Sequence, residues 1–378
     1  MSNDEYRETG MMKLNPEIDR TSWQVTLEWV RCNLFSSWWS SALTLLGLAV
    51  SYWVLWAVLD WAVFTAIFTG SDGSACRIPG AGACWPFITH KFKLFMYGRY
   101  PVEELWRVNL TYVLALGGLV PLMLPRVPGK LWLSVYMLVG FPIIAYFLLT
   151  GAEWLGLPIV TTDLWGGLLV TLVVACVGIA ASFPLGIILA LARRSDLPLI
   201  KWLAIIFIEF VRGVPLVTVL FFASVMLPLF LPENVTFDKL MRALIGVALF
   251  SAAYMAEVVR GGLQAIPRGQ FEAADALGMS YPQKMGFIVL PQALKLVIPG
   301  IVNSFIALFK DTSLVLIIGL FDLLGIVKQA AQSDAKWFAP QTAVTGYVFA
   351  AFVFWLFCFG MSRYSAWLET RLNAGQRH

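Results

Sequence analysis

Eight long apolar runs divide this chain of 378 residues, and they constrain its fold more than any other feature. A helix that crosses the hydrocarbon core of a bilayer needs about 20 apolar residues, because each residue adds about 1.5 Å to its length. Hydrophobic residues make up 59% of the chain and charged residues 13%, which excludes an ordinary water-soluble domain. The expected fold class is an all-α polytopic membrane protein with about eight transmembrane helices. The runs cover residues 42–68, 105–124, 131–149, 164–191, 199–231, 240–263, 299–321 and 343–365.

The spacing of the runs predicts four parts, and an even number of spans puts both termini on the same side of the membrane. Lys and Arg gather on the side that holds the two tails and the loop 265–291, so this side is expected to be cytosolic. The segment 76–107, on the opposite side, is also basic and therefore weakens this assignment of sides. The parts are a cytosolic N-terminal tail (1–41), a block of three spans (42–150), a five-span core (164–368) and a cytosolic C-terminal tail (369–378).

The five cysteines do not fit a metal-ligand pattern, and the chain has only two histidines, so no metal site and no cofactor are expected. Cys76 and Cys84 differ from the other cysteines because they share a Gly- and Pro-rich segment expected outside the cytosol, where a disulfide can persist. Their spacing leaves open whether the two thiols pair.

The loop between the sixth and seventh runs contains Glu272-Ala273-Ala274-Asp275-Ala276-Leu277-Gly278, followed by Ile288-Val289-Leu290-Pro291. Residues 268–281 suit a short amphipathic helix, with a proline at its first turn. Gly278 can adopt a left-handed backbone angle and permits a sharp bend, and Leu290-Pro291 is expected to end the second helical stretch. Such a narrow, bent hairpin suits docking in another protein; the alternative is a helix that lies on the membrane surface. The residues expected to dock are Arg268, Glu272, Ala273, Ala274, Asp275, Leu277 and Gly278.

Three further stretches accompany this loop: Arg212-Gly213-Val214-Pro215-Leu216, Ala256-Glu257-Val258-Val259-Arg260-Gly261-Gly262 and Lys310-Asp311-Thr312-Ser313-Leu314. Together with the loop, they resemble the motifs of permease subunits in type I ABC importers, in the polar amino acid branch. The resemblance covers about residues 164–368. Three added spans before a five-span core are also similar to the larger permease of a general L-amino acid transport system.

The resemblance implies a permease that translocates polar L-amino acids by alternating access in a bacterial inner membrane. It implies a cytosolic ABC ATPase dimer that grips the loops, a second permease subunit in a heterodimer or homodimer, and a periplasmic amino acid-binding protein that delivers the substrate; no nucleic acid partner is expected. The chain lacks a nucleotide-binding loop, because Gly129-Lys130 is followed by Leu131 and no glycine precedes it at the required spacing. It is therefore not expected to be an enzyme, and a partner subunit would hydrolyse ATP.

Charged residues within the spans are candidates for the substrate path, because a charge inside a bilayer usually faces a partner or a wet cavity. Lys310 and Asp311 lie about ten residues past Gly300, roughly 15 Å along the helix and hence near the midplane. Together with Thr312 and Ser313, they offer groups for the carboxylate and the ammonium of an amino acid. Alternatively, Lys310 and Asp311 pair with neighbouring helices and fix the bundle.

Glu257 and Arg212 are further candidates for the path. Glu257 lies three residues before Arg260 on one helix face, and a structural ion pair is the expected role of these two residues. Pro215 suggests that a span begins there, with residues 199–211 along the membrane and Arg212 reaching the cytosolic surface. If the whole run is instead one tilted helix, Arg212 lies near its middle and becomes a gate or substrate candidate.

Two other classes of function stay open at this point. An ion-gradient-driven carrier of small polar solutes would use Asp311 and Glu257 as proton or sodium sites. A membrane assembly factor would use the loop for docking and would transport nothing.

Overall fold

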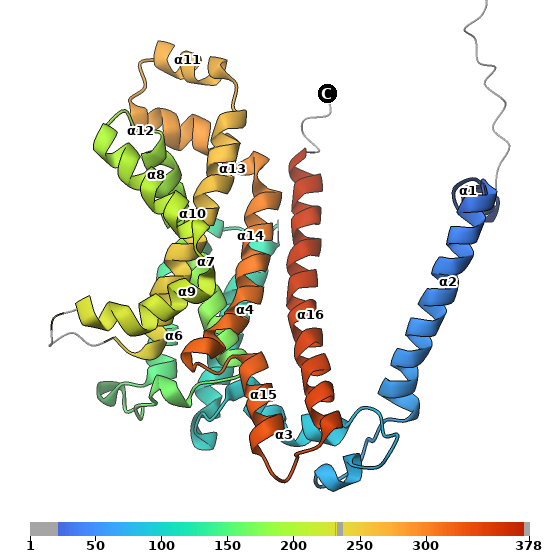
Figure 1. Cartoon of the computed structure of the whole chain (residues 1–378). Coiled ribbons are helices and arrows are strands. Elements are labelled where there is room, and N and C mark those ends of the chain that lie inside the picture. The colour runs from blue at the N-terminus through green and yellow to red at the C-terminus, as the bar shows by residue number, and fades with distance from the viewer. Residues whose placement is uncertain (1–21, 125, 231, 233–236, 374–378) are drawn as a thin grey trace, which may run out of the picture. The chain divides into compact units, whose positions relative to one another are not determined.

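The computed structural model describes residues 22–124, 126–230, 232 and 237–373. Within these ranges the chain is mostly helical, and β-structure is limited to isolated bridges. Seven of the described helices are long and apolar enough to cross a membrane, or up to eight if one bent pair forms a single span. The predicted all-α polytopic fold is therefore confirmed (Figure 1). The seven helices are Trp38–Phe64, Val102–Met123, Lys130–Thr150, Leu168–Arg193, Lys239–Ala265, Ile298–Ile318 and Pro340–Leu372.

The chain divides into two compact units, and the first comprises Met1–Ala66. Residues 1–21, which belong to the predicted N-terminal tail, lie outside the described residues. The described part of this unit contains α1 (Ser22–Leu34) and α2 (Trp38–Leu59), which continues into a π-helical turn, η1 (Asp60–Phe64). No residue of α2 is buried, and its large apolar side chains are exposed, as expected for a helix surrounded by lipid.

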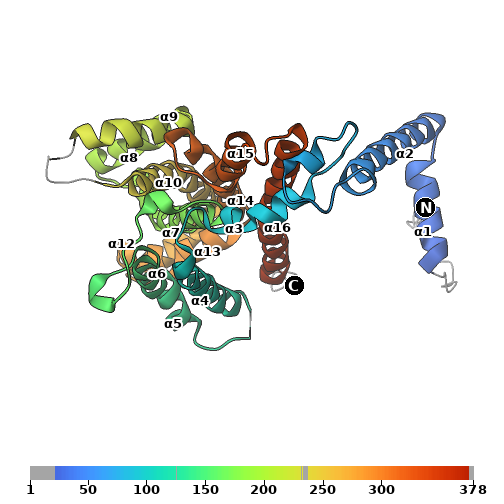
Figure 2. The same cartoon turned by 90° about the horizontal axis from the view of Figure 1, so that it is seen from below.

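The second unit comprises Ile67–His378, and residues 374–378 of the predicted C-terminal tail lie outside the described part. Figure 1 labels the helices of this unit except α5, which Figure 2 labels. Its described α-helices are α3 (Trp85–Tyr97), α4 (Leu105–Met123), α5 (Lys130–Val135), α6 (Phe141–Thr150), α7 (Leu168–Arg193), α8 (Pro198–Gly213), α9 (Leu216–Phe221), α10 (Lys239–Ala265), α11 (Arg268–Ala276), α12 (Tyr281–Gln283), α13 (Leu290–Leu296), α14 (Ile298–Asp311), α15 (Leu323–Ser333) and α16 (Pro340–Asn373).

Helices α7 and α10 pack against each other and form the centre of the second unit. Small residues at their contact allow a close approach. A Cβ atom added at Gly186 of α7 would lie only 2.6 Å from the Cβ atom of Met255 in α10. Ala252, Ala253 and Ala256 of α10 are fully buried. Helices α8 and α9 lie on one side of this central pair, and α4, α5 and α6 lie on the other (Figure 2).

The fifth predicted span is broken rather than straight. α8 ends at Gly213, α9 begins at Leu216, and the helical continuation of α9 reaches Phe230; the two halves are bent by 108°. Val214 between them is extended (φ −106°, ψ 138°), because a residue that precedes proline avoids the helical conformation. The alternative of one straight, tilted helix is therefore wrong, and Arg212 lies in the last turn of α8, at the break between the two halves.

Arg107 in α4 contacts both α6 and the loop that connects α6 to α7. Its side chain is fully buried in α4. Its Nε donates a hydrogen bond to the Leu148 carbonyl at 2.5 Å, and its Nη1 donates one to the Pro158 carbonyl at 2.9 Å. Since Leu148 lies in the last turn of α6, this contact satisfies a carbonyl that has no partner within its own helix. Arg107 thus fixes α4 against α6 and the following loop.

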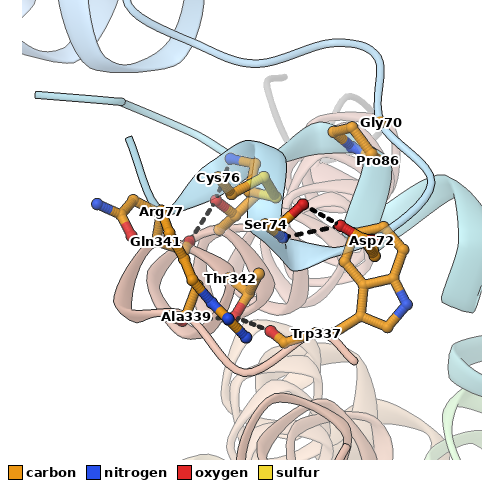
Figure 3. Close-up of a disulfide and its surroundings, with 12 residues drawn as sticks. Gly70, Asp72, Ser74, Cys76, Arg77, Pro86, Trp337, Ala339, Gln341 and Thr342 are labelled. Carbon is orange, nitrogen blue, oxygen red and sulfur yellow. Dashed lines mark hydrogen bonds between the residues drawn. A yellow bond between two sulfur atoms is a disulfide. The ribbon is translucent and has the colours of Figure 1, made fainter. Parts of the chain in front are cut away.

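Cys76 and Cys84 form a disulfide, the pairing that the sequence left open. Both cysteines are fully buried, and the segment that contains them, residues 67–84, is called the disulfide segment below. Figure 3 shows it against the loop between α15 and α16 and the first residues of α16. Nε of Arg77, just after the first cysteine, donates a hydrogen bond to the Phe338 carbonyl of this loop at 3.0 Å.

Helix α3 adds further contacts to the same loop. Lys91 of α3 forms an ion pair with Asp334, which follows α15. The hydrogen bond from Lys91 holds the pKa of the Asp334 carboxyl below its usual range. The Phe87 ring lies 5.9 Å from the Trp337 ring, measured between centroids. These contacts attach an early part of the second unit to the start of its last helix.

Candidate functional site

The coupling hairpin, residues 265–291, connects α10 to α13. α10 ends at Ala265, and Pro267 (φ −58°, ψ 141°) turns the chain into α11. In Figure 1, α11 lies at one end of the second unit, whereas α3 and α15 lie at the opposite end. The hairpin therefore projects from the end of this unit that is remote from the α15–α16 loop.

Helix α11 ends in a Schellman motif. The amide of Gly278 bonds to the Asp275 carbonyl at 2.9 Å, and the amide of Met279 bonds to the Ala274 carbonyl at 3.2 Å. Gly278 has a φ of +70°, the left-handed angle that the sequence predicted for it. The predicted helix over 268–281 is wrong at its C-terminal end, because this motif stops the helix before Gly278.

The two faces of α11 differ in exposure. Ala274 is fully buried, whereas Glu272 and Ala273 are exposed and Leu277 is 77% exposed. A Cβ atom added at Gly278 would meet nothing within 4 Å, so the bend itself faces open space. The outer face of α11 is therefore a narrow, accessible surface of small, charged and apolar side chains.

Asp275 is engaged within the hairpin rather than free to dock. Its Oδ1 lies 2.5 Å from Nζ of Lys284 in the second arm. Between these residues, Ser280 and Gln283 form a capping box that starts the second arm. Asp275 thus braces the two arms, while Glu272 forms no ion pair with any other described residue.

The second arm runs as one helix from Tyr281 to Leu296, through α12, the π-helical turn η9 (Lys284–Val289) and α13. The prediction that Leu290-Pro291 ends this stretch is wrong. Proline normally breaks a helix because it lacks the N–H and its ring crowds the carbonyl four residues earlier. Here the wider π-helical turn ends just before Pro291 and relieves that conflict.

Arg194 at the end of α7 supports the hairpin, and the sequence analysis missed it. Its Nη1 donates a hydrogen bond to the Leu263 carbonyl at 3.1 Å, and its guanidinium carbon lies 5.5 Å from the centre of the Phe271 ring. Arg194 thereby ties α7 to the end of α10 and to α11. Two adjacent arginines at the end of an apolar run are the signal that could have indicated it. A cavity of about 420 Å³ at this junction is lined by Arg194, Leu263, Gln264, Ile266, Arg268, Phe271 and Glu272.

A charge cluster joins α7, α8 and α10, and it consists of Arg193, Glu209, Arg212, Glu257 and Arg260. Glu257 accepts hydrogen bonds from Nη2 of Arg260 at 2.7 Å and from Nη1 of Arg193 at 2.9 Å. The predicted ion pair between Glu257 and Arg260 is therefore present. Arg193 also binds Glu209 at 2.8 Å. The sequence did not predict the role of Arg193, because 64 residues separate it from Glu257 and only the packing of α7 on α10 brings the two together.

The stretch from Lys310 to Ser313 lies where α14 changes into a 3₁₀-helix, η10 (Thr312–Ile318). Thr312 is buried, and its hydroxyl donates to the Phe309 carbonyl at 2.8 Å. The Ser313 hydroxyl donates to the Lys310 carbonyl at 2.9 Å. Lys310 is exposed and Asp311 is half-buried, and neither forms an ion pair with another described residue. Since η10 contacts α9, this stretch adjoins the second half of the broken span.

Comparison with known proteins agrees with this architecture. Residues 182–374 match the family described as "Binding-protein-dependent transport system inner membrane component". The chain belongs to this family, and it is a membrane permease subunit of an ABC importer. Permeases of this class act together with an ATPase and other importer components.

Several relatives are similar over nearly their whole length. The "Inner membrane amino-acid ABC transporter permease protein YhdY" of Escherichia coli (strain K12) is 51% identical to this chain. The alignment covers 92% of this chain and 93% of that protein. The "Glutamate/glutamine/aspartate/asparagine transport system permease protein BztC" of Rhodobacter capsulatus is 38% identical and covers 100% of both chains. Among solved structures, "Crystal structure of an amino acid ABC transporter with histidines" contains a chain with 29% identity and a TM-score of 0.46, covering 54% of this chain and 92% of that one.

These comparisons confirm the predicted membership in the polar amino acid branch of type I ABC importer permeases. They also agree with the multi-pass inner membrane location. The chain is the transport subunit of such a system rather than its ATPase. The alternative of an ion-gradient-driven carrier finds no support in them.

Proposed function

We propose that this chain forms the path by which polar L-amino acids enter a bacterial cell, and that it moves by alternating access driven by a separate cytosolic ABC ATPase dimer. The observation that carries the proposal is the geometry of α11. Its inner face is anchored through the fully buried Ala274, and its outer face presents Glu272, Ala273 and Leu277 without cover. Two relatives named as amino-acid permeases supply the substrate class.

The docking surface would comprise the outer residues of α11 and its C-terminal bend, with Asp275 holding the shape of the hairpin. Arg268 lines the cavity at the base of α11 and would contact the ATPase at its edge. The residues proposed for ATPase coupling are Arg268, Glu272, Ala273, Ala274, Asp275, Leu277 and Gly278.

Both termini and the coupling hairpin would lie in the cytosol. The C-terminal end of α16 and α11 lie at the same end of the second unit, which supports this orientation for the C-terminus (Figure 1). The disulfide segment then faces the periplasm, where the bond between Cys76 and Cys84 is not reduced. A periplasmic amino acid-binding protein would deliver the substrate at that end, and a second permease, in a heterodimer, would complete the path.

The substrate path would run beside the second half of the broken span and η10, which contact each other. Discontinuous helices often mark substrate sites in transporters, since they free backbone and side-chain groups at membrane depth. The residues proposed for the path are Arg212, Glu257, Lys310, Asp311, Thr312 and Ser313.

Reconstitution tests this function directly. The chain, purified with the subunits that copurify in mild detergent, should accumulate labelled L-glutamine, L-glutamate, L-asparagine or L-aspartate in proteoliposomes only when ATP and binding protein are supplied. Glu272→Ala should lower both ATPase retention and uptake, while the matched change Glu153→Ala in the loop after α6 should leave both unchanged. Uptake by the chain alone under an ion gradient would refute the proposal.

A further inference from the structure

The charge cluster carries an excess of positive charge. Three guanidinium groups, of Arg193, Arg212 and Arg260, face two carboxylates, of Glu209 and Glu257. The side chain of Glu257 is only 14% exposed, so the cluster is partly withdrawn from water. A partly desolvated cluster with one unmatched cation attracts an additional anion more strongly than a solvated surface does.

Arg212 is the least satisfied of the three arginines. Its Nη1 lies 3.6 Å from Oε2 of Glu257, beyond hydrogen-bonding distance, whereas Arg193 and Arg260 both hydrogen-bond to that carboxylate. Nε of Arg212 is buried and has no hydrogen-bond partner in the part of the chain that the structure describes. A buried donor without an acceptor is costly, so it marks a place where a partner is expected.

The surroundings of Arg212 hold its guanidinium in place without a hydrogen bond from its N–H groups to another described residue. The guanidinium carbon lies 5.6 Å from the centre of the Tyr254 ring, within the range of a cation–π contact. The Tyr254 hydroxyl lies 3.4 Å from the Arg212 carbonyl. At the neighbouring Gly213, an added Cβ atom would meet nothing within 4 Å. Arg212 is thus oriented and 34% exposed, and the adjoining Gly213 faces open space at the break between α8 and α9.

From this geometry we infer that Arg212 binds the α-carboxylate of the transported amino acid, with Glu257 as its counter-ion while the site is empty. The inference rests on the proposed function and names the residue that recognises the negative group of the substrate. A planar guanidinium with free N–H groups matches a carboxylate in a two-bond geometry. The substrate carboxylate would accept hydrogen bonds from Arg212 in place of the 3.6 Å contact between Arg212 and Glu257. Glu257 keeps its hydrogen bonds from Arg193 and Arg260.

The same donors would also suit the phosphate of a lipid headgroup, since both ligands are anions with several acceptor oxygens. The substrate is favoured by the position of Arg212 at a break between two halves of an apolar run, rather than at the end of an uninterrupted helix. A test must therefore separate recognition of the substrate carboxylate from recognition of lipid.

The experiment measures equilibrium binding of a labelled amino acid to the purified complex in detergent, without the binding protein. The probe is whichever of L-glutamine, L-glutamate, L-asparagine and L-aspartate the wild-type complex accumulates in proteoliposomes, and its α-amide serves as the competitor that lacks the carboxylate. Wild type should prefer the acid over the amide by roughly 10- to 100-fold, the range for one charge-assisted hydrogen-bonded contact.

Arg212→Gln should weaken binding of the acid by roughly 10- to 100-fold and bring the acid-to-amide ratio close to one. Arg212→Lys should keep part of the preference, because the charge stays and the two-bond geometry is lost. Glu257→Gln should tighten binding of the acid by removing its competitor. Lys201→Gln, which removes an exposed cation from the same helix, is the matched control and should bind as wild type does.

If Arg212→Gln binds the acid over the amide with the same preference as wild type, the inference is overturned. A binding preference near one in wild type also overturns it, and this measurement does not depend on the folding of any variant. Loss of copurifying phospholipid in Arg212→Gln with an unchanged ratio would assign the site to lipid instead. A wild-type complex with no ATP-driven uptake of any of the four amino acids would refute the proposed function, whereas normal uptake with an unchanged ratio would refute the carboxylate site alone.

Discussion

Lys284 and Asp275 form an ion pair across the bend of the coupling hairpin, with Nζ 2.5 Å from Oδ1. Asp275 lies on α11, whose outer face is exposed, and Lys284 lies in the first turn of the second arm, which leads back to the membrane core. The pair therefore links the proposed docking surface to the arm that would carry its movement. This link does not depend on the backbone turn between the two residues.

The ion pair should matter for coupling more than for stability. The Asp275 side chain is 57% exposed, and exposed pairs usually contribute about 0–1 kcal/mol. Asp275→Ala and Lys284→Ala should each lower ATP-driven uptake without changing the thermal unfolding midpoint, and the double variant should lose no more than the worse single variant. A double-mutant cycle on uptake rates measures this. Additive losses would show that the two residues act independently.

Gly278 should be essential for the shape of the hairpin. Its φ of +70° costs an L-residue about 1–2 kcal/mol, and a β-branched side chain suffers most. Gly278→Val should reduce ATPase retention and uptake by roughly tenfold or more, while membrane insertion stays normal. Gly261→Val is the control, because a Cβ atom there also meets open space but the backbone is helical. Normal uptake by Gly278→Val would contradict the assigned role of the bend.

Removal of the disulfide should loosen one end of the second unit and leave the other intact. The two cysteines are eight residues apart, so their bond restricts a short loop and contributes about 2–3 kcal/mol in the loop-entropy description. The double variant Cys76→Ser, Cys84→Ser should increase hydrogen exchange in residues 67–98 and around Trp337. ATPase retention should stay at the wild-type level. Cys32→Ser, at an exposed free cysteine, should change neither measurement.

Asp322 should make stability depend on pH. It caps α15 by accepting hydrogen bonds from the amides of Gly325 and Leu324, and burial raises its pKa to about 6 from an ordinary value of 3.8. Because the folded state holds the proton more tightly, stability should fall by about 2 kcal/mol as pH rises from 4 to 6, and level off above about pH 7.

Asp322→Asn should remove this dependence, since asparagine does not titrate and caps a helix as well as aspartate does. Thermal unfolding in detergent at several pH values between 4 and 7 measures the difference from wild type. Asp163→Asn, at an exposed position, should retain the wild-type profile. Parallel curves for wild type and Asp322→Asn would show that this carboxyl does not control the transition.

Local patterns predicted the features that depend on neighbouring residues. Apolar runs gave the spans, since each run is long enough to cross a bilayer by itself. The left-handed angle of Gly278 followed from its place between an amphipathic stretch and a proline-containing one. The ion pair of Glu257 with Arg260 followed from their spacing on one helix.

Features that depend on packing between distant segments could not be predicted in this way. Arg193 meets Glu257 only because α7 and α10 lie side by side. The pairing of Cys76 with Cys84 required a fold that brings their side chains together. The π-helical turn before Pro291 is a departure from regular geometry, and a proline by itself indicates the end of a helix rather than this adjustment.

The tight contact between Gly186 and Met255 limits how the central helices can move. With so little room at Gly186, α7 and α10 cannot slide lengthwise past each other without a collision between Met255 and the α7 backbone. We therefore expect α7 and α10 to tilt together, rather than slide past each other, when α11 is displaced.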